Sequence, residues 1–152
     1  MKAFFISFFL IYISLNNSFS QSLYAEKIEF NHGNSIVLNS FIKIEIYAVS
    51  EDQFLVISKI NDVTKQKNIK HKEYKEVFDA ILNIQSKDLL NENRDGLDGS
   101  DTSIKIGGMF NNYTEYNVWG LDKNDKNNSF KDFFYATELL LKLVGIKIEQ
   151  LK

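Results

Sequence analysis

Residues 94–145 read RDGLDGSDTSIKIGGMFNNYTEYNVWGLDKNDKNNSFKDFFYATELLLKLVG, and this stretch decides the fold. A turn rich in Asp and Gly opens it. Two short apolar runs follow, joined at Asn111-Asn112, where a tight turn is expected because Asn tolerates a positive φ. The last part places apolar residues at the i, i+3, i+4, i+7 spacing of an amphipathic helix. We therefore predict a β-hairpin over residues 104–119 and a helix over residues 129–144.

Local signals fix both ends of this helix. Ser129 is the expected N-cap, with Asp132 three residues later in a capping-box arrangement. Gly145 supplies the stop, because glycine readily takes the left-handed conformation that ends many helices. Four residues of the helix are expected to face the sheet: Phe133, Leu140, Leu141 and Val144.

Alternating segments nearer the N-terminus predict the rest of the sheet. Period-two alternation of apolar and polar residues is the pattern of a strand with one buried face. It occurs over residues 24–30 and 41–49, and the apolar run 54–57 predicts a more central strand covered on both faces. Asn31 to Asn34 is expected to be a turn from its composition, with His32 inside it.

The remaining segments complete the expected architecture. Residues 61–70 are polar without strong periodicity, so no element is predicted there. Over residues 71–84 apolar side chains recur at helical spacing, which predicts a second helix. Because strands and helices do not alternate singly, we predict an α+β fold. It is a single two-layer domain, a mostly antiparallel sheet of about five strands packed against two helices.

The first 20 residues have the layout of a secretory signal peptide. Lys2 precedes an apolar run, and Ser18 and Ser20 occupy positions −3 and −1 of a cut before Gln21. The run, residues 3–15, is shorter than the roughly 20 residues needed to cross a bilayer, which favours a cleaved signal over a membrane anchor. We therefore expect an exported protein, periplasmic or secreted. Its mature part, residues 21–152, is expected to be one domain with no membrane span.

Composition limits the possible classes of function. The chain has 18 basic and 20 acidic side chains, a net charge of −2, and scattered lysines, so no nucleic-acid partner is expected. The chain has no cysteine, which excludes disulfides and thiol catalysis; an exported chain of this kind is typical of bacteria. It also lacks a Gly-rich phosphate loop, a His-Glu-x-x-His pair and a Gly-x-Ser-x-Gly elbow. No catalytic residue is assigned, and no cofactor is expected.

The second half of the chain resembles a loose group of small uncharacterised exported bacterial proteins. In that group an amphipathic helix is followed by a Leu-Asp-Gly turn, a hairpin ending near a Trp, and a final Phe/Leu-rich helix. The matching residues here are Leu97 to Ser100, Ile104 to Ile106, Val118-Trp119 and Phe130 through Leu141. The resemblance implies an exported α+β domain and no defined activity.

The loop that begins at Asn91 is a candidate calcium site whose pattern argues against binding. Asn91, Asn93, Asp95 and Gly96 occupy positions 1, 3, 5 and 6 of the EF-hand loop. Position 1 should be Asp and position 12 a bidentate Glu, but position 12 here is Thr102. Because affinity follows the charge of the ligands, we predict no metal site. The loop is interpreted as a turn held by Asp and Gly backbone geometry.

Two other groups of polar residues receive structural interpretations. The two histidines lie far apart and outside any catalytic motif. His32 is interpreted as a turn residue and His71 as a surface residue at a helix start. A second polar loop is interpreted as a solvated connection before the last helix: Asp122, Asn124, Asp125 and Asn127.

The predicted hairpin is the candidate recognition surface. Tyr113, Glu115 and Asn117 share one face of its second strand, with Trp119 on the same side. If this face is exposed, it joins an aromatic anchor to polar neighbours, as interface hot spots do; if it is buried, the hairpin is only scaffold.

The leading hypothesis is a non-enzymatic binding module of the inhibitor, immunity or envelope accessory type, with another exported or envelope protein as its partner. The absence of catalytic motifs from a small exported domain motivates it. The alternatives are a small hydrolase that uses carboxylates or an oxygen-ligated metal, and a structural component of the envelope.

Overall fold

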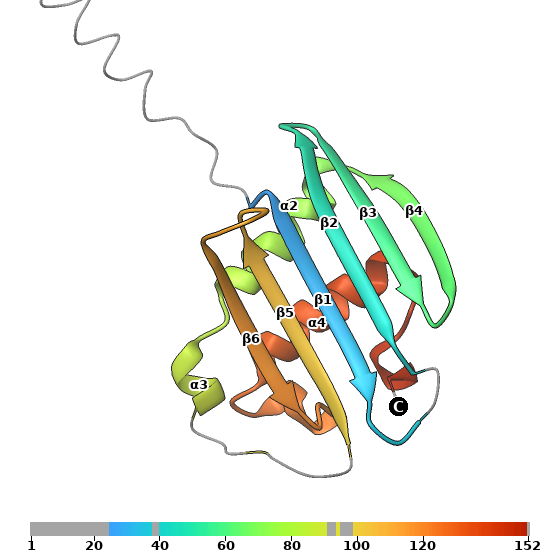
Figure 1. The fold of residues 1–152 in the computed structure, drawn as a ribbon. Coiled ribbons are helices and arrows are strands. Elements are labelled where there is room, and N and C mark those ends of the chain that lie inside the picture. The colour runs from blue at the N-terminus through green and yellow to red at the C-terminus, as the bar shows by residue number, and fades with distance from the viewer. Residues whose placement is uncertain (1–24, 38–39, 91–93, 95–98, 152) are drawn as a thin grey trace, which may run out of the picture.

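The computed structural model describes residues 25–37, 40–90, 94 and 99–151, so the expected cleavage site at Ser20–Gln21 lies outside the described residues. The described chain forms a six-stranded antiparallel sheet in the order β4-β3-β2-β1-β5-β6. Helices α2 and α4 cover one face of this sheet (Figure 1). The predicted two-layer α+β domain is confirmed, with a sixth strand. The elements are β1 Lys27–Asn34, β2 Ile42–Ser50, β3 Gln53–Ile60, β4 Val63–Ile69, α2 His71–Leu82, α3 Ser86–Leu90, β5 Ser100–Gly107, β6 Tyr113–Trp119, η1 Lys123–Asn127, α4 Lys131–Leu143 and η2 Ile148–Gln150.

Strand β1 joins the two halves of the sheet. On one side it pairs with β2, so that Ile28 lies opposite Ile46. On the other side it pairs with β5, so that Ile28 also lies opposite Ile106. The N-terminal meander β1–β4 and the β5–β6 hairpin therefore meet only after α2 and α3 have passed behind the sheet.

The core lies between the sheet and the two long helices. Ile28, Phe30 and Ile104 point toward the helices and are fully buried. From α4, Phe133, Leu140 and Leu141 are buried, and Val144 packs against the core while staying partly exposed. The predicted sheet-facing side of this helix is confirmed. Each buried side chain of this size contributes about 1.5–3 kcal/mol through removal from water.

The two ends of α4 differ in how well the sequence predicted them. Gly145 has a φ of 75°, and the N–H groups of Gly145 and Ile146 bond to the carbonyls of Lys142 and Leu141 at 3.2 and 3.0 Å. This is a Schellman motif, so the predicted stop is confirmed. The predicted Ser129 cap is wrong. The N-cap is Phe130, which makes no side-chain cap bond because its ring is buried in the core.

The predicted turn at residues 31–34 is also wrong, because β1 continues through it. Asn34 pairs with Ser100 at the end of β5, so the partner strand keeps this polar segment extended. His32 is consequently a core residue that is 2% exposed, and its Nδ1 lies 2.9 Å from the Thr102 hydroxyl. His71 does stand exposed at the start of α2, as expected.

Strand β4 is an element that the sequence pattern did not predict. It pairs with β3 along its length, but as an edge strand its side chains are exposed except Ile69. The turn before it places Asn61 at a φ of 55°. With β4 outside it, β3 is one strand in from the edge, and its Leu55 and Ile57 stay partly exposed. The prediction that residues 54–57 are covered on both faces is therefore wrong.

The β5–β6 hairpin has the predicted Asn turn. Asn112 has a φ of 60°, and its carbonyl accepts a hydrogen bond from the Gly108 N–H at 3.1 Å. A Cβ on Gly107 would overlap the same carbonyl oxygen, so glycine is needed where the strands approach the turn. Among the helices that the structure describes, none has the length and apolar character needed to cross a bilayer.

Candidate functional site

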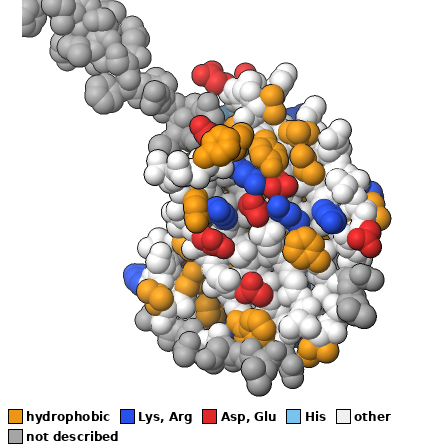
Figure 2. Space-filling model, in the orientation of Figure 1, with side chains coloured by type: hydrophobic (Ala, Val, Ile, Leu, Met, Phe, Trp, Pro, Cys, Tyr) orange, Lys and Arg blue, Asp and Glu red, His pale blue; other side chains and the backbone are white. Residues whose placement is uncertain are grey.

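The second face of the sheet is the candidate site, because no described helix covers it (Figure 1). Strand side chains alternate between faces. Since Ile28 and Phe30 point toward the helices, Lys27, Glu29 and their counterparts on other strands point the opposite way. We call this side the open face. Figure 2 shows charged side chains gathered at its centre, with hydrophobic side chains around them.

Strand register aligns residues from four strands into one row across the open face. Glu29 of β1 lies opposite Glu45 of β2. On its other side it lies opposite Lys105 of β5, and Lys105 lies opposite Glu115 of β6. Residues 70 or more positions apart in the sequence thus become direct neighbours.

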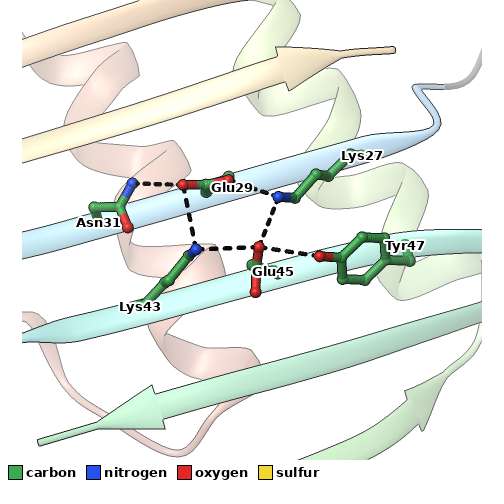
Figure 3. A network of polar contacts seen from close by, with 6 residues as sticks. All are labelled: Lys27, Glu29, Asn31, Lys43, Glu45 and Tyr47. Atoms are coloured by element: carbon green, nitrogen blue, oxygen red, sulfur yellow. Dashed lines mark hydrogen bonds and ion pairs between the residues drawn. The ribbon is translucent and has the colours of Figure 1, made fainter. Parts of the chain in front are cut away.

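A network of polar contacts occupies the centre of this face (Figure 3). Lys27 Nζ lies 2.7 Å from a Glu29 oxygen and 2.6 Å from a Glu45 oxygen. Lys43 Nζ lies 3.2 Å from Glu45 and 3.6 Å from Glu29. We call these residues, with Asn31 and Tyr47, the polar network.

Hydrogen bonds and partial burial make the polar network rigid. The Asn31 amide donates to Glu29 at 3.1 Å, and the Tyr47 hydroxyl donates to Glu45 at 3.0 Å. The four charged side chains are only 18–32% exposed. Like charges directly opposite each other destabilise a sheet, and here Glu29 and Glu45 are tolerated because both lysines bridge them.

The contacts within the network shift the pKa values of its members. Burial alone would raise the pKa of Glu29, but hydrogen bonds from Lys27 and Asn31 lower it from 4.5 to about 2. The pKa of Glu45 is lowered too, since hydrogen bonds from Lys27 and Tyr47 outweigh burial. Burial alone would lower the pKa of Lys27, but its bonds to the two glutamates raise it. Burial and the bond to Glu45 raise the pKa of Tyr47.

These shifts determine what the network can do chemically. A general acid or base works best when its pKa lies near the operating pH. Here every shift moves a group further from neutrality, so the carboxylates stay ionised and Lys27 stays protonated. The polar network is therefore suited to presenting a fixed pattern of charges and is poorly suited to moving protons.

The residues singled out on the hairpin lie on the open face, beside the network. Tyr113, Glu115 and Asn117 are all exposed. The Lys105 Nζ lies 3.5 Å from the centre of the Tyr113 ring, which is a cation–π contact. Trp119 is partly buried, and Gly99 lies against its ring. The structure thus brings the three hairpin residues to one side of the network.

The turn of the same hairpin presents apolar side chains. Phe110 is 86% exposed and Met109 is 49% exposed. The Met109 N–H donates to the Glu26 carboxylate at 2.9 Å, which ties this turn to the residues before β1. The hairpin turn therefore offers an apolar patch beside the charged centre of the open face.

The sequence analysis missed the polar network. The two contributing segments show the same Lys-x-Glu spacing, Lys27-x-Glu29 and Lys43-x-Glu45. That repetition was the available signal. It identifies two strands with a charged face, but only the register places the four side chains in contact.

The second polar loop is not the solvated connection that was expected. Asp125 is fully buried and accepts two bonds from Arg94, at 2.9 and 2.7 Å. It also accepts the Asp122 N–H at 2.9 Å and the Asn128 amide at 2.8 Å. Burial alone would raise its pKa, but these partners lower it, Arg94 above all. The loop is a structural clamp that fastens η1 to the segment containing Arg94.

The expected calcium-like loop falls mostly outside the described residues. Asn91, Asn93, Asp95 and Gly96 all belong to that part, so the absence of a calcium site there stays a prediction. Its last position, Thr102, is buried within β5. Within the described part of the chain, no group of three or more His, Asp or Glu side chains is placed to hold a metal ion.

Comparison with known proteins adds no assignment. No protein-family model matches the chain, no curated protein is detectably similar to it, and no solved structure matches its fold.

The network predicts a specific dependence of stability on pH. Because the folded-state pKa of Glu29 is depressed, its contribution is present above the unfolded value of 4.5 and is lost as pH falls toward about 2. Between about pH 6 and pH 3, the wild type should therefore lose more free energy of unfolding than Glu29→Gln. Urea unfolding at both pH values measures this. Glu51→Gln, in an exposed turn, is the control and should follow the wild type. Equal losses in wild type and Glu29→Gln would contradict the account.

Proposed function

We propose that this protein is a non-enzymatic binding module that uses the open face to bind a protein partner. One observation carries the proposal: a whole face of a six-stranded sheet is left without a covering helix in the described chain, yet its central charges are fixed and partly buried. Surfaces of this kind mark interaction sites when apolar groups adjoin them. Here Tyr113, Met109 and Phe110 supply the apolar part.

The size of the open face favours a macromolecular partner. Neighbouring strands lie about 4.8 Å apart and each residue adds about 3.3 Å along a strand. Six strands of 7–9 residues therefore make a face of roughly 24 Å by 25 Å, or about 600 Å². A standard protein interface buries about 800 Å² on each partner, so this face and the hairpin turn together suffice.

Rigidity of the polar network supports specific recognition. Binding normally costs free energy because side chains must be ordered at the interface. Lys27, Lys43 and the two glutamates already hold one another in place, which lowers that cost. Alternating charges of fixed position also favour partners with the complementary pattern and reject others.

The alternative of a carboxylate-dependent hydrolase receives less support from these residues. The usual two-carboxylate mechanism needs one protonated carboxyl as general acid and one ionised carboxylate. Glu29 and Glu45 both have lowered pKa values, so neither supplies the acid.

Site-specific photocrosslinking tests which face binds. A photoreactive amino acid replaces Tyr113 in one variant and Tyr135 in the other, in cells that produce the protein. The two tyrosines are matched, being 53% and 50% exposed, but Tyr135 lies on α4, away from the open face. We expect one defined crosslinked product from position 113 and none from position 135. The same product from both positions, or from position 135 alone, would reject the open face.

The captured partner then allows a quantitative test. Tyr113→Ala combined with Glu115→Ala should weaken its affinity at least about tenfold, since aromatic anchors dominate interface energies. The melting temperature should be unchanged, because both side chains are exposed. Unchanged affinity for that partner, or an equal loss in a Tyr135→Ala variant, would show that this surface is wrongly assigned.

We also propose that the protein acts outside the cytoplasm, after removal of residues 1–20. The support is the short apolar run and the Ser18 and Ser20 positions. Intact-mass measurement of the protein recovered from the exported fraction should give a chain that starts at Gln21. A species that retains Met1 and sediments with membranes would contradict this.

A further inference from the structure

A groove on the other side of the molecule lies between edge strand β4 and the end of α4. Its volume is about 450 Å³, within the range of about 300–1,000 Å³ typical of small-molecule sites. The floor is apolar and includes Val56, Leu143 and Val144. Three lysines stand around it: Lys65, Lys67 and Lys142. The groove is therefore separate from the open face.

Strand register explains why two of these lysines face the helix side of the sheet. Lys67 lies opposite Val56 and Lys65 lies opposite Ser58. Val56 and Ser58 are both buried beneath the helices, and paired residues share a face. The two lysines thus extend the helix-covered face beyond the place where α4 ends, with their apolar stems beside the core and their ammonium groups in solvent.

The lysines carry charge that the protein itself leaves uncompensated. Across the described residues, the ion pairs formed do not involve Lys65, Lys67 or Lys142, and all three are exposed. The end of α4 does not supply the missing acceptors. Its Leu141 and Lys142 carbonyls accept the N–H groups of residues 144–146.

The combination of an apolar floor and a cationic rim defines the chemistry of a ligand. A small inorganic anion would contact the ammonium groups but gain nothing from Val56 and Leu143. An uncharged apolar molecule would leave the lysines unused. We propose that the groove binds a linear amphiphile with an anionic head, of the fatty-acid class. Its chain lies on the apolar floor, and its carboxylate accepts charge-assisted hydrogen bonds from the lysines.

Calorimetric titration with sodium dodecanoate, below its micelle concentration, tests the proposal on the purified protein. We expect one molecule bound per chain. Lys65→Gln combined with Lys67→Gln should weaken binding about tenfold, since charge-assisted bonds are lost. The control is Lys59→Gln combined with Lys72→Gln. It removes the same charge from outside the groove and should leave the affinity unchanged.

Two further probes separate head from chain. Dodecyltrimethylammonium has the same chain and a cationic head, and inorganic phosphate has the charge without a chain; neither should bind. Lys142→Gln, on the helix, should also weaken dodecanoate binding, and it replaces the strand variant if that variant aggregates. The inference is overturned by no dodecanoate binding, by equal binding of both amphiphiles, or by equal affinity in the groove and control variants. In those cases the lysines only protect the β4 edge from pairing with other strands.

Discussion

The double pairing of β1 is the constraint on which the rest of the structure depends. This strand is hydrogen-bonded to β2 on one edge and to β5 on the other, so it joins a local meander to a distant hairpin. Its inward side chains Ile28 and Phe30 are fully buried. Because side chains alternate, a register shift of one residue would move these to the outside and bury the charged ones. Burial of the core therefore also fixes the position of every polar residue on the opposite face.

The two faces of β1 consequently share one register but have different roles. Toward the helices, the strand supplies core contacts, including the buried contact between His32 and Thr102. Away from them, Glu29 meets Lys27, Lys43 and Lys105 from three strands. The energy that holds the charges in place comes mainly from the apolar core, because partly exposed ion pairs contribute little by themselves. Stability on one side thus provides preorganisation on the other.

Local patterns predicted the parts of the fold that depend on near neighbours. The apolar spacing of α4, the stop at Gly145 and the turn at Asn112 each follow from a few adjacent residues. β4 was missed because an edge strand with one buried residue, Ile69, leaves almost no periodic signal. The extension of β1 to Asn34 was missed because a partner strand holds this turn-like segment open.

The candidate site divides in the same way. Tyr113, Glu115 and Asn117 were identifiable because they alternate along one strand, and alternation alone puts them on one face. The polar network needs contacts between β1 and β2, and the buried Arg94–Asp125 pair needs contact across 31 positions. No sequence pattern within either segment specifies those contacts, since they depend on strand register and on which loop closes over the core.

The register of β1 can be measured directly in solution by interstrand nuclear Overhauser effects in NMR spectra of the labelled protein. The account predicts backbone contacts from Glu29 to Glu45 on one side and to Lys105 on the other, together with slow amide exchange in β1. Contacts from Glu29 to residues one position away from these, or rapid exchange throughout β1, would contradict it. Either result would remove the basis for placing the polar network and the hairpin residues on a common surface.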